Sequence, residues 1–335
     1  MKIFPIACES LGTRSFCHLV MTESVNILVD PSVSLGPKRF GLKPHPTEIA
    51  ASWISRQTIM EISQLADVII QTHYHGDHFT LNSPRKYEFS NKEIFRALYN
   101  PEVTIIAKDY EKNINYRQQQ RAKHLWKNKK ISVSKADNNH YEFGSTQITF
   151  SPAVPHGVQE ASVFVVEVMI KEGDRSYIFT SDVCGPSSKE ATDFIITNLP
   201  DIVAVDGIPF YISKTEEYIE EAFRNLSKIV DEIREIYIDH HFLRSLEWEN
   251  KLQENLGRKL PAFSNLRNQK PFLLEAQRRQ LHNDDPTRED FYNSFYVDDY
   301  SITYFRELLQ KNGFHHYWKK LKEDVKEENA KLKNI

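Results

Sequence analysis

Apolar and polar positions alternate in short blocks through the first seventy residues. Residues 15–21 and 25–29 are apolar, and the short polar segment between them is typical of a β-hairpin turn. Residues 47–65 place apolar side chains at helical spacing, with Thr47 as the expected N-cap. The apolar run 67–71 predicts a short buried strand. This part of the chain therefore predicts two strands, a helix and a third strand in succession.

Strand and helix patterns keep alternating through residue 239. The expected strands are 147–150, 162–170, 176–180, 201–206 and 236–239. Before the last of them, residues 214–236 form a strongly amphipathic helical pattern, with Phe223, Leu226 and Ile229 on one face. Such alternation indicates an α/β fold that carries its functional site at one edge of the sheets.

One segment differs from its surroundings in charge. Between residues 108 and 135 only Asp109 and Glu111 are acidic, whereas nine residues are basic: Lys108, Lys112, Arg117, Arg121, Lys123, Lys127, Lys129, Lys130 and Lys135. We interpret residues 84–135 as a basic helical insertion. It could follow a nucleic-acid backbone, with Tyr116, His124 and Trp126 available for base stacking. The alternative is a solvated basic helix with Trp126 packed inward.

The overall composition is that of a globular chain. The 335 residues carry a net charge of −3, which gives no global attraction to nucleic acid or to an anionic membrane. No apolar run approaches the roughly 20 residues that span a bilayer. Cys8, Cys17 and Cys184 are too few and too scattered for a disulfide framework. We therefore expect a cytoplasmic location, reduced thiols and no membrane partner.

The densest group of ligand-type side chains is the segment QTHYHGDHF, residues 71–79. On an extended segment His73 and His75 can point the same way, and Gly76 permits a turn that aims Asp77 and His78 at the same region. Imidazole and carboxylate suit Zn²⁺ and similar first-row ions. Four ligands within six residues exceed the need of one ion, so the segment favours two.

Further candidates follow along the chain, each at a strand end or in a short loop. They are His156, Asp182 and the adjacent pair His240 and His241. A single histidine is more often a hydrogen-bonded structural residue, and a single strand-end aspartate is more often a cap. Their order after the histidine cluster favours the metal-binding interpretation.

This order resembles the metallo-β-lactamase superfamily. Asp30, the H-x-H-x-D-H cluster, His156, Asp182 and a final histidine match its series over about residues 1–245. The segments ESLGTRS, DPSVSLGPKRFGLKPHP, NINYRQQQRA, DHHFLRSL and LLEAQRRQLH are similar to a mainly archaeal family of predicted metal-dependent hydrolases within it. That resemblance covers residues 1–283 and leaves 284–335 as a C-terminal helical extension. It implies a four-layer αβ/βα sandwich.

The resemblance also implies a role for each ligand. His73, His75 and His156 would bind the first metal, Asp77, His78 and the last histidine would bind the second, and Asp182 would bridge the two. The segment IDHHF is similar to the THF motif of tRNA-end-processing nucleases, which favours His241 as the last ligand. Neighbours on an extended segment face opposite ways, so His240 is then expected beside the ligands or as a proton donor. Asp30 is expected to brace the site without binding metal.

The expected chemistry is hydrolysis. Two divalent ions, Zn²⁺ first and Mn²⁺ or iron as alternatives, can hold a bridging hydroxide that attacks the substrate. The charges of the ions, Asp77, Asp182 and the hydroxide leave an excess of about +1, which favours an anionic substrate such as a phosphodiester. Lys38 and Arg39 could hold that anion, or could simply be solvated loop cations.

Two alternatives remain open at this stage. The same metals could hydrolyse small esters, lactones or thioesters. In a different class, the protein could bind nucleic acid through its basic helix, with metals that are purely structural. The expected partner is accordingly an anionic small molecule or a nucleic acid, and the sequence is compatible with a homo-oligomer.

Overall fold

The computed structural model describes residues 1–157, 162–212, 215–287, 291–292, 299–311 and 313–333. Two six-stranded sheets and one two-stranded ribbon organise the chain. The first sheet consists of β1 (Lys2–Cys8), β2 (Phe16–Met21), β3 (Asn26–Val29), β4 (Val68–Gln71), β5 (Thr104–Ala107) and β6 (Val133–Lys135). The strands lie side by side in this order, antiparallel from β1 to β3 and parallel from β3 to β6.

The second sheet has the order β14-β13-β12-β11-β8-β7. Its strands are β7 (His140–Phe143), β8 (Thr146–Phe150), β11 (Val168–Glu172), β12 (Arg175–Phe179), β13 (Ile202–Val205) and β14 (Glu235–Ile238). Strands β12 to β14 are parallel, and the others are antiparallel. The ribbon pairs β9 (Val154–Pro155) with β10 (Phe164–Val165).

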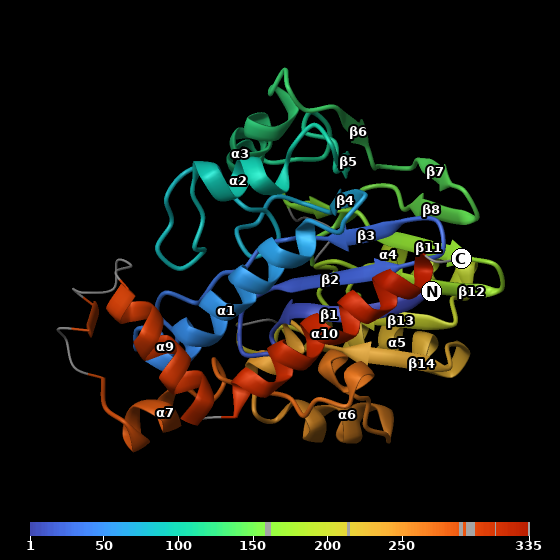
Figure 1. The fold of residues 1–335 in the computed structure, drawn as a ribbon. Coiled ribbons are helices and arrows are strands. Elements are labelled where there is room, and N and C mark those ends of the chain that lie inside the picture. The colour runs from blue at the N-terminus through green and yellow to red at the C-terminus, as the bar shows by residue number, and fades with distance from the viewer. Residues whose placement is uncertain (158–161, 213–214, 288–290, 293–298, 312, 334–335) are drawn as a thin grey trace.

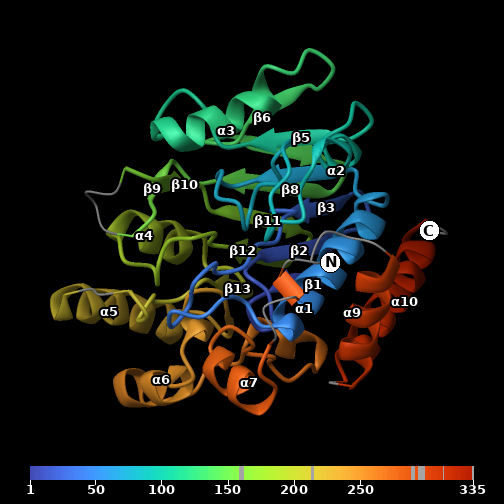
Figure 2. The same ribbon diagram turned by 90° about the vertical axis from the view of Figure 1, so that its left-hand side faces the viewer.

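Helices cover the outer face of each sheet (Figures 1 and 2). The helical segments are α1 (Pro46–Ser63), α2 (Lys92–Leu98), α3 (Tyr116–Trp126), α4 (Lys189–Asn198), α5 (Glu216–Glu232), η1 (Phe242–Arg244), α6 (Trp248–Leu256), η2 (Phe263–Arg267), α7 (Arg278–Asp284), α9 (Asp299–Lys311) and α10 (Phe314–Leu332). On the first sheet α1 packs on β1, and α9 and α10 pack on α1. On the second, α5 buries the predicted apolar face against β13 and β14.

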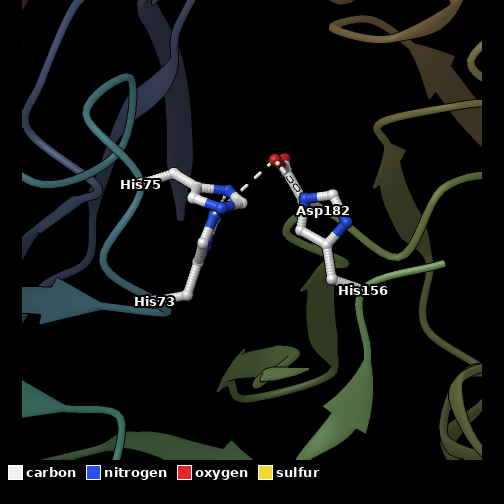
Figure 3. A group of neighbouring side chains, drawn as sticks. All are labelled: His73, His75, His156 and Asp182. Carbon is white, nitrogen blue, oxygen red and sulfur yellow. Dashed lines mark hydrogen bonds and ion pairs between the residues drawn. The ribbon is translucent and has the colours of Figure 1, made fainter. Parts of the chain in front are cut away.

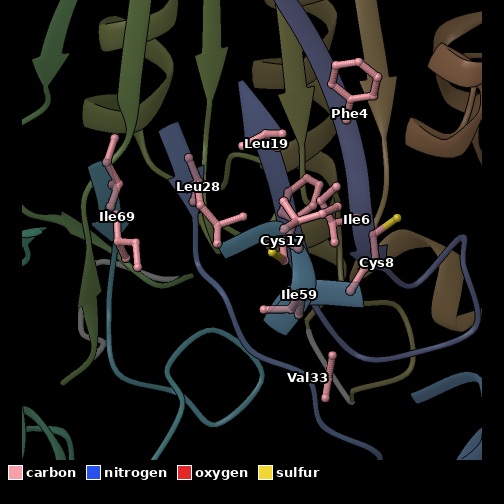
Figure 4. Close-up of a cluster of buried hydrophobic side chains, with 14 of the residues drawn as sticks. Phe4, Ile6, Cys8, Cys17, Leu19, Leu28, Val33, Ile59 and Ile69 are labelled. Atoms are coloured by element: carbon pink, nitrogen blue, oxygen red, sulfur yellow. The ribbon is translucent and has the colours of Figure 1, made fainter. Parts of the chain in front are cut away.

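The inner faces of the two sheets meet in one continuous core. Phe16 of β2 lies edge-on to Phe179 of β12, with ring centroids 4.7 Å apart. Leu19, Leu28 and Ile69 belong to the same buried cluster but lie on the opposite face of the first sheet, which α1 covers with Ile59 (Figure 4). Helix, sheet, sheet and helix thus form four layers, which confirms the predicted αβ/βα sandwich.

Three sequence-based expectations need correction or completion. The N-cap of α1 is His45, not Thr47, because the His45 ring accepts the Thr47 N–H and Glu48 reaches back to the His45 N–H. Segment 84–135 is not purely an insertion, since it supplies β5 and β6 to the first sheet. The C-terminal segment is helical as expected, and it buries Phe314 and Trp318 in the core. Residues 288–290 and 293–298 of the expected extension lie outside the described residues.

One buried histidine joins the sheets and makes stability depend on pH. His18 of β2 donates from Nδ1 to the Phe16 carbonyl and accepts the Tyr177 hydroxyl of β12 at Nε2, 3.2 Å each. Burial lowers the pKa of His18 to about 3, against 6.5 in a model peptide. Between these pH values the unfolded chain binds a proton that the folded chain does not, so stability is lost as the pH falls from 6.5 towards 3.

We therefore expect wild type to lose stability relative to His18→Gln in this window, by up to about 1.4 kcal/mol per pH unit. Urea unfolding of both proteins at pH 7 and at lower pH measures the difference. A difference that does not change with pH would contradict the assignment.

None of the helices in the described part of the chain is both long enough and apolar enough to cross a membrane.

Candidate metal centre

The histidine cluster lies on the loop that follows β4, and Asp30 at the end of β3 holds this loop. The Asp30 carboxylate accepts hydrogen bonds from the Thr72 N–H at 2.8 Å and the Thr72 hydroxyl at 2.5 Å. It also lies 2.8 Å from His78 Nδ1. Because the other nitrogen of that ring then points away from Asp30, the contact orients His78 towards the centre of the site.

A first group of side chains comes from both sheets. His73 and His75 follow β4, His156 follows β9, and Asp182 lies just beyond β12. Figure 3 shows the rings of His73 and His75 on one side, that of His156 on the other, and the Asp182 carboxylate between them. Asp182 Oδ2 lies 3.3 Å from His156 Nε2 and 3.6 Å from His73 Nε2. The four ligand atoms lie within 4.8 Å of one another.

A second group lies on the other side of Asp182. It consists of Asp77, His78 and His240. Asp182 Oδ1 is 3.0 Å from His78 Nε2 and 3.4 Å from His240 Nε2, and Asp77 Oδ2 is 3.6 Å from His240 Nε2. The two oxygens of one carboxylate therefore face two separate sets of ligands.

The histidine at the second group is His240, whereas the sequence favoured His241. Both rings lie at the site, so the expectation that neighbouring side chains point to opposite sides is wrong here. The reason is the backbone: His240 has φ +46°, in the left-handed region, and the chain is no longer extended there. His241 lies near Cys184 and His156, with Nε2 3.8 Å from Asp182 Oδ2 and Nδ1 2.8 Å from Asp206.

Left-handed backbone recurs around the site. Asp30, Ser181 and Cys184 have φ values of +47°, +57° and +55°. Non-glycine residues hold such angles only where surrounding contacts fix them, and they concentrate at functional sites. Here they turn the chain sharply at strand ends and aim side chains from several strands at one volume.

Burial and charge set the protonation of the cluster. Burial lowers the pKa of His75 to about 3 and that of His240 to about 4. For Asp182 burial opposes ionisation, but the charges of His78 and His240 outweigh it and hold the pKa well below its usual value. For His78, burial is likewise outweighed by Asp182, which raises its pKa. The carboxylates thus draw positive charge into the site.

The residues fit divalent metal ions. Asp182 Oδ1 and His156 Nε2 are buried and lie 3.0 Å from His78 Nε2 and 3.3 Å from Asp182 Oδ2, but neither atom makes a well-aligned hydrogen bond among the described residues, although buried polar atoms are normally paired. Neighbouring imidazoles also turn nitrogens towards each other, with His73 Nε2 and His75 Nδ1 3.1 Å apart. In the absence of a cation one of them can donate to the other, and a shared cation would be bound by both lone pairs instead.

The side chains of the centre differ in exposure. Within the described ranges, His73, His78 and His240 are fully buried, whereas the side chains of His156 and Asp77 are 17% and 18% exposed. The solvent-accessible part of the described site thus lies at Asp77 and His156, next to His75.

The two predicted anion-binding residues lie outside these groups. Lys38 is exposed and Arg39 is largely packed. Arg39 donates to the Arg244 carbonyl at 2.9 Å and lies over the Tyr211 ring, whose centroid is 6.3 Å from that of His241. Arg39 thus reaches the edge of the site through Tyr211.

The sequence pattern did not point to Arg244, whose guanidinium lies at the second group. It is buried, and its Nη2 is 3.0 Å from His240 Nε2 and 3.5 Å from Asp77 Oδ2. Glu9 accepts from its Nε at 2.9 Å and holds it in place. The available signal was its position in the segment DHHFLRSL, directly after the histidine pair. Asp206, the partner of His241, was visible only as the end of an apolar run.

The chain has close relatives among archaeal proteins. It is 35% identical over 313 residues to a UPF0282 protein of Korarchaeum cryptofilum, covering 89% of this chain and 100% of the relative. It is 38% identical over 290 residues to a UPF0282 protein of Pyrococcus furiosus, covering 84% of this chain and 92% of the relative. No family model matches the chain.

Among solved structures, the metallo-β-lactamase fold protein YhfI from Bacillus subtilis is similar, with a TM-score of 0.46 and 13% identity over 81% of this chain and 96% of that one. The four layers described above rest on the strand order and core of this chain and not on that likeness.

Proposed function

The chain belongs to the UPF0282 family, and we propose that it is a hydrolase that uses two divalent metal ions, preferably Zn²⁺, to cleave phosphodiester bonds. One observation carries the proposal: the two oxygens of Asp182 face two separate ligand groups. A purely structural site closes around one ion, whereas an arrangement with an exposed side leaves room for a substrate.

The proposed ligands divide as the geometry groups them. His73, His75, His156 and Asp182 would hold one ion, and Asp77, His78, His240 and Asp182 the other. When bound, two divalent ions lower the pKa of coordinated water to roughly 7 and polarise the bond under attack.

The remaining residues position these groups. Asp30 orients His78, and Asp206 orients His241. With Nδ1 held by Asp206, His241 can accept or return a proton at Nε2 without moving. Arg244 adds a buried positive charge beside Asp77, which favours an anionic substrate.

The ligand assignment predicts different metal contents for two neighbouring variants. We expect His240→Ala to lose about one equivalent of metal, because only Asp77, His78 and the shared Asp182 then remain at the second group. His241→Ala should keep about two equivalents, since Asp182 and three histidines remain at the first group. Elemental mass spectrometry of proteins purified without chelator measures both. The reverse pattern would make His241 the ligand.

The proposed reaction is tested with a panel of chromogenic phosphodiesters and carboxylic esters, with added Zn²⁺ or Mn²⁺. Wild type should cleave phosphodiesters, and an excess of chelator should abolish the activity. Hydrolysis of esters alone would replace the proposal with the ester-hydrolase alternative.

A further inference from the structure

A small cavity of about 190 Å³ joins the exposed side of the metal centre to the start of α3. His75 and Asp77 line it on the metal side, and Arg117, Gln118 and Arg121 line it on the helix side. Arg117 is exposed, and Arg121 is held in place by a 2.9 Å hydrogen bond to the Tyr74 carbonyl. Two guanidinium groups therefore stand beside the route by which a substrate reaches the metals.

The amide of Gln118 points to what this cavity binds. Gln118 is 3% exposed, and its Oε1 accepts the Tyr74 N–H at 3.2 Å. Its Nε2 is buried and has no hydrogen-bond partner within the described ranges. A buried donor without an acceptor costs about 1–3 kcal/mol. Between two arginines, an anionic oxygen is the acceptor that suits it.

A second cavity, of about 310 Å³, continues the first along α3 and shares Arg117 and Arg121 with it. Arg85, Tyr116 and His124 also line it. Arg117, Arg121 and His124 follow each other at helical spacing, so they lie on one face of α3. The adjacent face of α3, with Gln118, Ala122 and Leu125, is buried.

We call the second cavity the groove along α3. Its charge and its exposed aromatic ring suit a polynucleotide. Arg85, Arg117 and Arg121 outnumber the two acidic groups nearby, Glu88, which faces Arg85 and Arg121, and Asp77, which faces Arg121. Tyr116 is 77% exposed and offers a free ring face. Of the two alternatives for Trp126, base stacking and inward packing, the structure has the second: its Nε1 donates to the Tyr74 hydroxyl at 2.7 Å and its ring stacks on Tyr110.

We infer that the cavity at Arg117, Gln118 and Arg121 binds a phosphate of single-stranded nucleic acid next to the phosphate at the metals, and that the groove along α3 holds the following nucleotides. This inference rests on the proposed function and names its substrate class. Single strands are favoured over duplexes because Tyr116 can stack only on an unpaired base.

The test measures binding and not turnover. A fluorescent single-stranded oligonucleotide with phosphorothioate linkages, which keep the charge and resist hydrolysis, is titrated with zinc-loaded protein over a range of salt concentrations. Arg117→Glu should weaken binding about tenfold, and Arg117→Ala should lower the salt slope by about 0.7. Lys129→Glu makes the same charge change at an exposed residue that lines neither cavity, and it should alter affinity less than twofold.

Gln118→Glu is a nearly isosteric second variant. It keeps the acceptor for the Tyr74 N–H and replaces the unpartnered donor with an oxygen, so it should also weaken binding about tenfold. Its metal content and circular dichroism spectrum should match those of wild type.

Equal losses in Arg117→Glu and Lys129→Glu, or none in Arg117→Glu and Gln118→Glu, would overturn the inference. A nucleoside monophosphate or a duplex that binds as tightly as the single strand would overturn the substrate class. Binding that depends on Arg117, in a protein that cleaves no phosphodiester, would leave this subsite standing and remove the proposed function. Phosphodiester cleavage at the wild-type rate in Arg117→Glu and Gln118→Glu would support the proposed function and remove this subsite.

Discussion

Asp182→Ala should bind less than one equivalent of metal and retain at most about one-thousandth of the hydrolytic activity. Asp182 is 1% exposed and presents Oδ2 to His73 and His156 and Oδ1 to His78 and His240. Its loss removes a ligand from both groups and a negative charge from a buried cluster of histidines. Elemental mass spectrometry and the phosphodiester assay measure the two effects on the same sample.

Asp182→Asn removes the negative charge of this side chain and keeps its size and shape. The amide has the same size but is a far weaker metal ligand, so this variant should lose metal as well. Asp174→Ala, in the exposed turn between β11 and β12, is the control and should behave as wild type. An Asp182→Ala protein with two equivalents of metal would refute the bridging role.

Gly207→Ala should lower the free energy of unfolding by about 2–5 kcal/mol. Gly207 has φ +80°, where any other residue is strained. A Cβ atom here would also lie 2.4 Å from Cδ2 and 2.6 Å from Cβ of Phe242, which is fully buried. Because Phe242 directly follows the histidine pair, any shift that relieves this overlap should also disturb His240 and weaken metal binding.

Gly173→Ala is the matched control. Gly173 also has a positive φ, +56°, but a Cβ there meets nothing within 4 Å. It should cost only about 1 kcal/mol of backbone strain. Denaturant unfolding of both variants, with metal content measured in parallel, separates the cost of the strained backbone from the cost of the overlap between the added Cβ and Phe242. If both variants lost the same free energy of unfolding, Phe242 would have to move away from the added Cβ at little energetic cost.

The sequence predicted the parts of the molecule that depend on local spacing. The hairpin of β2 and β3, the strand before the histidine cluster and the amphipathic face of α5 were all visible as periodic patterns. The cluster at residues 73–78 could be assigned from spacing alone, because these side chains are brought together by one loop.

The parts that depend on tertiary contacts were not visible. Strands β5 and β6 are only short runs within a basic segment, and the charge around them suggested an insertion. The choice between His240 and His241 depended on a φ angle that no periodic pattern encodes. Arg244 enters the site from a short 3₁₀ helix, and only the fold shows that this turn packs between Glu9 and His240.

Three imidazoles of the candidate metal centre are held by groups of the protein itself. Asp30 holds His78, the Ser15 carbonyl lies 3.1 Å from His240 Nδ1, and Asp206 holds His241. Because protein atoms alone orient these rings, the proposed site would offer the same ligands to any divalent ion that reaches it. Affinities of first-row ions follow a fixed chemical order, so the supply of free ions in the cell would then decide which metal the proposed site takes.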